Sequence, residues 1–133
     1  MYGEADTKGL GGESLKEGWL GTWKNRDKGT RGIAQLLIED LNPMMMSVWG
    51  IMGGKISPKR VSYVELPLNS EEGASLEGKS EIEASYDHGW ATQTFSMELH
   101  EDGITLISYM DYYDPQRENQ RFEYEFVQGG WKD

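Results

Sequence analysis

The stretch Arg121-Phe122-Glu123-Tyr124-Glu125-Phe126 alternates charged and aromatic side chains at every position. Successive side chains of a β-strand point to opposite faces, so this period of two predicts one buried aromatic face and one solvated charged face. The stretch Glu81-Ile82-Glu83-Ala84-Ser85-Tyr86 repeats the pattern with smaller apolar residues. Such alternation is typical of antiparallel sheets that pack one face on a core.

Turn-forming residues divide most of the chain into segments of this kind. The Asp-Gly pair at 102–103 and the Asp-x-Gly at 87–89 suit hairpins, because glycine supplies the positive φ that such turns need. About eight short strands at this spacing predict an all-β fold, a single antiparallel up-and-down β-barrel. We expect these strands over residues 19–25, 32–39, 44–52, 61–66, 80–86, 90–99, 104–113 and 117–127.

A chain of 133 residues has the length of one domain. The first seventeen residues lack any period, so we expect a flexible N-terminal arm over 1–17, a barrel domain over 18–128 and a C-terminal tail over 129–133. Ser14 and Glu17 have the spacing of a capping box and predict one helical turn that closes an end of the barrel. The N-terminus has no signal-peptide pattern, so we expect either a cytoplasmic protein or a leader removed before Met1.

The composition argues against several classes of function. A formal net charge of −10 disfavours nucleic acids and anionic membranes as partners, because both are polyanions. The absence of cysteine excludes disulfides and thiolate metal sites, and two histidines are too few for a multi-histidine centre. The longest apolar run, residues 44–52, is too short for membrane insertion as a helix. We therefore expect no metal and no cofactor.

The first expected strand contains Gly21-Thr22-Trp23. This Gly-x-Trp resembles the opening motif of lipocalins and related calycins. The resemblance implies that Trp23 plugs the closed end of the barrel and that an arginine from the last strand packs across it. Arg117 and Arg121 both lie on the expected last strand, and either would gain cation–π attraction from the indole.

A longer stretch, residues 21–33 (GTWKNRDKGTRGI), resembles the start of a group of uncharacterised small bacterial barrel proteins. Trp49-Gly50 and the spacing of Asp111, Arg117 and Asn119 are also similar to that group. Many of its members carry a cysteine pair just after the Trp-Gly, where this chain has Ile51 and Met52. This departure weakens the implication of a secreted, disulfide-bonded setting for this chain.

The interior of an eight-stranded barrel either is filled by side chains or holds one small ligand. Methionine and aromatic side chains on the expected inner face suit an adaptable apolar pocket, but they would equally pack a solid core. The expected inner residues are Leu36, Ile38, Ile82, Leu106, Phe122 and Phe126 and, as ligand contacts, Trp23, Met46, Val48, Tyr86, Phe95, Met97, Met110 and Tyr124.

The remaining candidate sites have simpler explanations. The residues Met44-Met45-Met46 alternate between faces, so their sulfurs cannot converge on a metal. The carboxylates of Asp87, Glu101, Asp102, Asp111 and Asp114 lie near turns without the spacing of a calcium loop. His88 and His100 lie in or beside turns without a triad arrangement, so we expect no catalytic residue and no enzyme. Asp111, Arg117 and Asn119, together with Arg31, would form either a structural ion-pair network or an anion-binding patch.

These patterns lead to one main expectation and two alternatives. The main expectation is a non-enzymatic protein that binds a small apolar or amphipathic molecule inside the barrel. The first alternative is a protein–protein interaction module with a packed core, either a monomer or a homodimer, which docks through Tyr109, Tyr112 and Tyr113. The second is a barrel enzyme with a buried acid and tyrosine pair, which would need a titratable group with a shifted pKa in the cavity.

Overall fold

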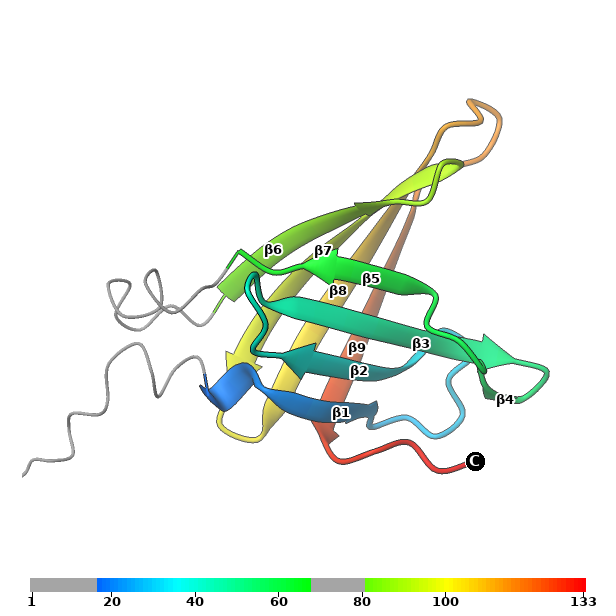
Figure 1. Ribbon diagram of the computed structural model, residues 1–133. Helices are drawn as coiled ribbons and strands as arrows, with labels where there is room; N and C mark the ends of the chain where they lie inside the picture. Colours follow the sequence, from blue (N-terminus) through cyan, green and yellow to red (C-terminus); the bar gives the residue numbers. More distant parts are fainter. Residues whose placement is uncertain (1–16, 68–80) are drawn as a thin grey trace, which may run out of the picture.

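Nine antiparallel strands form one strongly curved sheet in the computed structural model, which describes residues 17–67 and 81–133 (Figure 1). The sheet order is β4-β3-β2-β1-β9-β8-β7-β6, and β5 pairs with β3 beside this path. The strands are β1 (Gly21–Asn25), β2 (Ile33–Glu39), β3 (Met45–Met52), β4 (Lys55–Ile56), β5 (Ser62–Glu65), β6 (Glu81–Asp87), β7 (Ala91–His100), β8 (Gly103–Tyr112) and β9 (Gln120–Gln128).

The pairing of β1 with β9 joins the first and last strands, so the sheet curls back on itself. Strands β5 and β6 lie close together, but among the described residues no ladder of hydrogen bonds connects them. The predicted all-β, antiparallel, barrel-like fold is therefore confirmed, in the form of a curled half-barrel. Within the same residues no helix has the length and apolar character needed to cross a membrane.

Most strand boundaries lie within one or two residues of those expected, and three elements differ more. Strand β9 begins at Gln120 and not at 117, because Arg117 belongs to a turn in which its N–H donates to the Asp114 carbonyl at 3.0 Å. The short β4 was not expected, and it follows a turn at Gly53-Gly54 in which both glycines have positive φ. One helical turn lies at 17–19, whereas most of the expected turn at 14–17, and the N-terminal arm apart from Glu17, fall outside the described residues.

The core fills the end of the half-barrel that bears this helical turn. Trp19 and Trp23 are both buried there, and the Trp23 indole N–H donates to the Trp19 carbonyl at 3.0 Å. The apolar positions of all the long strands converge on the same cluster. Its other large members are Leu36, Ile38, Met44, Met46, Val48, Leu66, Phe95, Met97, Ile104, Leu106 and Phe126.

Strands β6 to β9 extend past the packed core at the opposite end, where Figure 1 shows them projecting beyond β3 and β5. Along β9 the burial falls step by step, since Phe126 is fully buried, Tyr124 is half-buried and Phe122 is 41% exposed. The alternation correctly predicts which face each residue occupies. The expectation that Phe122 is buried was wrong, because the opposing strands β3 and β5 do not extend far enough to cover it.

The C-terminal residues 129–133 pack along the outside of the sheet. The Gly129 N–H donates to the Thr22 carbonyl at 2.9 Å, and the Trp131 N–H donates to the Gln35 side-chain oxygen at 2.9 Å. The Asp133 carboxylate accepts a hydrogen bond from the N–H of Ile56 at 2.9 Å. These bonds bring the segment that we expected as a tail against β1, β2 and β4.

Candidate functional site

The projecting end of the sheet presents large apolar side chains, most of them aromatic rings, on its core-facing side. The strand registers place Tyr86, Met110, Tyr112 and Phe122 on the same face as the buried core residues. Trp90 joins them from the turn between β6 and β7, and its side chain is 54% exposed. Since large apolar rings are normally buried, an exposed group of them on the inner face of a half-barrel is a candidate ligand contact.

Three of these rings, together with His88, form a continuous series of ring contacts. The Tyr86 and His88 rings meet edge to face with centroids 4.8 Å apart, and His88 stacks on Trp90 at 4.9 Å. Trp90 stacks on Tyr112 at 6.1 Å, with 20° between the ring planes. The guanidinium carbon of Arg117 lies 3.7 Å from the centre of the Tyr112 ring. We call Tyr86, His88, Trp90, Tyr112 and Arg117 the aromatic ladder.

The turn that carries Trp90 is held by local hydrogen bonds. The Gly89 N–H donates to the Asp87 carboxylate at 2.8 Å, and the Tyr113 N–H donates to the Trp90 carbonyl at 3.1 Å. The bond from Gly89, together with one from the Tyr113 side chain, lowers the pKa of Asp87. Glycine with a φ of 90° allows this tight turn. These bonds fix the backbone at Trp90, which carries the most exposed ring of the ladder.

A buried polar network lies beside the ladder. Gln93, which is 9% exposed, donates from its amide nitrogen to the Ser108 hydroxyl at 2.8 Å. Its amide oxygen lies 2.9 Å from His88 Nε2 and accepts a hydrogen bond from the Ser62 hydroxyl at 3.3 Å. Ligand sites are commonly apolar surfaces with a few fixed polar groups, and this network adds such groups to the aromatic face.

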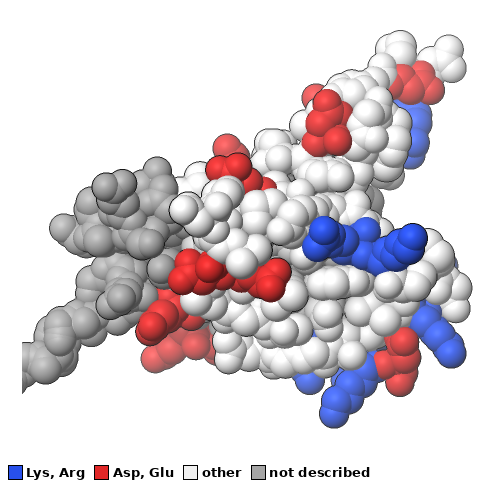
Figure 2. Space-filling model, viewed as in Figure 1, with Lys and Arg blue, Asp and Glu red and all other residues white. Residues whose placement is uncertain are grey.

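Charge divides sharply between the two faces of strands β6 to β9. Every aspartate and glutamate of these strands has the register of the outer face, namely Glu81, Glu83, Asp87, Glu98, Asp111, Glu123 and Glu125. The core-facing positions hold no carboxylate. On the side of the molecule seen in Figure 2, acidic side chains lie on the projecting sheet and near one end of the molecule, and basic side chains gather nearer β4.

The predicted ligand contacts separate into two groups. Five of them are buried in the packed core and contact one another there: Trp23, Met46, Val48, Phe95 and Met97. Three are half-buried where the core gives way to the aromatic face: Tyr86, Met110 and Tyr124. The structure thus brings only the second group to a surface that a ligand can reach. Trp90, His88, Gln93 and Phe122 join that surface, and none of them was predicted as a ligand contact.

The expected packing of an arginine on Trp23 is not what the structure contains. Trp23 pairs with Gln128 at the other end of β9, far along the strand from Arg117 and Arg121. Arg117 lies on Tyr112, and Arg121 contacts Glu123 at 3.3 Å on the outer face. The predicted positions of both arginines were wrong, because the register between β1 and β9 could not be derived from the sequence.

The other predicted groupings are also dispersed. The expected network of Asp111, Arg117, Asn119 and Arg31 does not form, because Asp111 points to the outer face and Arg31 lines a different pocket. Tyr109 and Tyr113 have outer-face positions, whereas Tyr112 lies on the inner face.

The charged and titratable groups of the turns do not assemble into a metal centre. His100 lies 3.3 Å from the Glu98 carboxylate on the outer surface and is distant from His88. In residues 17–67 and 81–133 no group of three or more metal-ligating side chains comes together.

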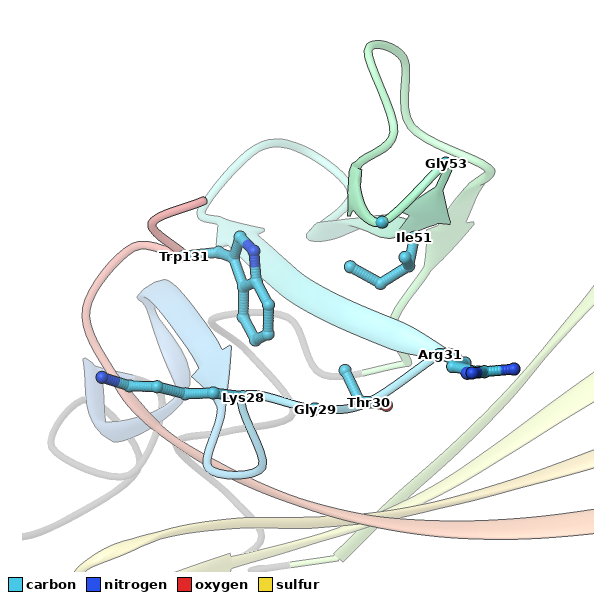
Figure 3. Close-up of a pocket in the computed structure, with 8 residues that line it drawn as sticks. Lys28, Gly29, Thr30, Arg31, Ile51, Gly53 and Trp131 are labelled. Atoms are coloured by element: carbon cyan, nitrogen blue, oxygen red, sulfur yellow. The ribbon is translucent and has the colours of Figure 1, made fainter.

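Away from the aromatic face, a hollow of about 460 Å³ lies between residues 28–31, the turn at Gly53-Gly54 and Trp131. Figure 3 shows the Trp131 ring and Ile51 on opposite sides of it, with Thr30 pointing toward it. The side chains of Lys28 and Arg31 extend away from the hollow in the same view. Its only ring is that of Trp131, and no buried polar network accompanies it among the residues that line it. The aromatic face is therefore the stronger candidate.

Comparisons of the chain with protein-family models, with curated proteins and with solved structures find no match. The resemblance of Gly21-Thr22-Trp23 to the calycin motif thus stays a prediction. The functional argument depends on the geometry of the site alone, since a fold by itself does not specify a function.

Proposed function

We propose that the protein binds a small apolar or amphipathic molecule at the open end of its half-barrel and that it is not an enzyme. The observation that carries this proposal is the exposed aromatic face next to a buried polar network. Trp90 and Phe122 offer apolar area that no described residue covers. A ligand that covered these rings would gain roughly 25 cal/mol for each Å² of apolar surface removed from water.

The polar network supports an amphipathic ligand in particular. Gln93 and Ser108 are buried and already paired, so they provide oriented amide and hydroxyl groups without a large cost of ordering. The buried part of the half-barrel serves as a rigid base for this face, because its apolar side chains are packed in one continuous cluster. The apolar part of the ligand lies on the rings, and a neutral polar group on it reaches toward the network, near His88.

Binding of a neutral naphthalene derivative, 1-naphthaleneacetamide, tests the proposal by isothermal titration calorimetry. Phe122 and Tyr109 form a matched pair, because both are 41% exposed and they lie on opposite faces of the same sheet. We expect Phe122→Ala and Trp90→Ala each to weaken binding by about tenfold, and Tyr109→Ala to leave it unchanged. Absence of saturable binding, or equal losses from Phe122→Ala and Tyr109→Ala, would contradict the proposal.

The alternative of a protein-docking module has a separate readout. Tyr109 and Tyr113 are exposed on the acidic outer face, so a self-association surface there would make the protein dimerise. Sedimentation velocity of the wild type and of Tyr109→Ala measures this directly. A dimer that is lost in Tyr109→Ala, together with no binding of the naphthalene probe, would favour the docking function.

A further inference from the structure

We infer that the ligand of the aromatic face carries an anionic group, such as a carboxylate, which pairs with Arg117. This inference rests on the proposed function and specifies the charge of the molecule that is bound. It is carried by three observations: the position of the guanidinium, the absence of carboxylates on the core-facing side of β6 to β9, and the continuity of the ladder.

Arg117 is oriented by the ring beneath it. Its guanidinium carbon lies 3.7 Å from the centre of the Tyr112 ring, and Tyr112 in turn donates its hydroxyl hydrogen to the Gln120 side-chain oxygen at 2.6 Å. Stacking on a ring occupies one face of the guanidinium and leaves its N–H groups, which point outward in the plane, for an acceptor. The geometry suits the two oxygens of a carboxylate, which an arginine binds through parallel hydrogen bonds.

No carboxylate of the described residues forms an ion pair with Arg117. The ion pairs in this part of the chain join Arg26 to Asp102, His100 to Glu98 and Arg121 to Glu123. Arg121 is the informative comparison, because it lies on the neighbouring strand β9 but on the outer face, where Glu123 neutralises it. In a protein with a formal net charge of −10, Arg117 is thus a cation that lies on a ring of the aromatic ladder without an ion-pair partner among the described residues.

The overall negative charge does not outweigh this local arrangement. Electrostatic interactions through solvent are screened over about 8 Å at physiological ionic strength. The carboxylates of β6 to β9 point away from the aromatic face, on the opposite side of the sheet. Asp114 and Glu118 lie in the same turn as Arg117, but neither forms an ion pair with it. A group that contacts Arg117 is therefore governed mainly by that arginine.

The position of Arg117 also defines how the ligand lies. The ladder runs without interruption from Tyr86 through His88 and Trp90 to Tyr112, and Arg117 is at its end. An apolar body that covers Trp90 therefore places an acidic group attached to it beside the guanidinium. A cationic group in the same position would meet the like charge of Arg117, and no carboxylate on the core-facing side of β6 to β9 would offset it. The site thus favours anionic over neutral ligands and neutral over cationic ligands.

The test compares 1-naphthaleneacetate with 1-naphthaleneacetamide, which has nearly the same shape and no charge. We expect the wild type to bind the acetate at least tenfold more tightly than the amide at low salt, and the difference to shrink as sodium chloride is added. Arg117→Gln should weaken binding of the acetate far more than binding of the amide, so that most of this preference is lost. Arg121→Gln is the matched control, and it should change neither affinity.

The possible outcomes separate the inference from the function on which it rests. Equal affinities for the acetate and the amide in the wild type would overturn the inference and leave the proposed function intact. An equal loss of both ligands in Arg117→Gln would also overturn it, because the arginine would then shape the face and not pair with charge. Failure of the wild type to bind either ligand would overturn the inference together with the proposed function. Trp131→Phe, which alters the hollow beside residues 28–31, should retain the wild-type preference, and its loss in that variant would assign the charge selectivity to that hollow.

Discussion

The hydroxyl group of Tyr124 lies in the space over Gly32 that any other residue would fill with its Cβ atom. The two residues belong to elements far apart in the sequence, since Gly32 precedes β2 and Tyr124 lies in β9. The backbone of Ile33 also forms a hydrogen bond with the Tyr124 hydroxyl. This contact packs Tyr124, at the border between the core and the aromatic face, against the first half of the chain.

Gly32→Ala should destabilise the protein by about 1–3 kcal/mol, because the new methyl group overlaps the Tyr124 hydroxyl. Tyr124→Phe removes the oxygen, so the double variant Gly32→Ala/Tyr124→Phe should lose less stability than the sum of the two single variants. Urea unfolding of the four proteins measures this coupling. Gly103→Ala is a useful contrast, since its obstacle is the backbone carbonyl of Phe126 and no side-chain change relieves it. Additive effects of Gly32→Ala and Tyr124→Phe would contradict the assigned contact.

Tyr124 should also make the protein sensitive to alkaline pH. Burial raises the pKa of this tyrosine above its ordinary value, and the hydrogen bond from Ile33 only partly opposes the effect. Above about pH 10 the unfolded chain releases the phenol proton while the native protein still retains it, so stability falls as the pH rises. Unfolding free energies from pH 7 to pH 11 should decline more steeply for the wild type than for Tyr124→Phe. Parallel profiles of the two proteins would mean that Tyr124 does not contribute.

Gln93→Leu should cost about 1–3 kcal/mol of stability, because it leaves the polar groups of Ser62, His88 and Ser108 beside an apolar side chain. Thr94→Ala is the control, since Thr94 is the next residue on β7 and its hydroxyl contact with Ser85 is exposed. Chemical denaturation provides the measurement. A loss no greater than that of Thr94→Ala would show that the network contributes little.

Trp23→Ala should destabilise the fold by about 3–5 kcal/mol, because it empties a large part of the core and removes the hydrogen bond to Trp19. Arg117→Gln should have an effect within about 0.5 kcal/mol, since its side chain lies on the exposed end of the ladder. The melting temperatures of the two variants therefore compare the packed core, which holds Trp23, with the projecting end of the sheet, which holds Arg117. Similar losses in both would contradict the separation of core and site described above.

The sequence by itself determined the kind of fold and, in the strands with clear alternation, the face on which each residue lies. The alternation from Arg121 to Phe126 and from Glu81 to Tyr86 predicts antiparallel strands, and the observed registers place those side chains as the period of two requires. This part of the structure is local, because successive side chains of a strand must point to opposite sides. Turn residues at 87–89 and 102–103 are local as well, and they correctly located two hairpins, although of the two glycines only Gly89 has the expected positive φ.

Only the tertiary structure decided where the core ends and the site begins. Phe122, Tyr124 and Phe126 have the same pattern in the sequence, yet they are exposed, half-buried and buried respectively. Their burial depends on how far the opposing strands β3 and β5 extend. Likewise, the register of β9 against β1 separates Arg117 from Trp23, and the β6–β7 turn brings Trp90 onto Tyr112. These relationships depend on contacts between segments distant in the chain, and a period of two holds no information about strand length or register.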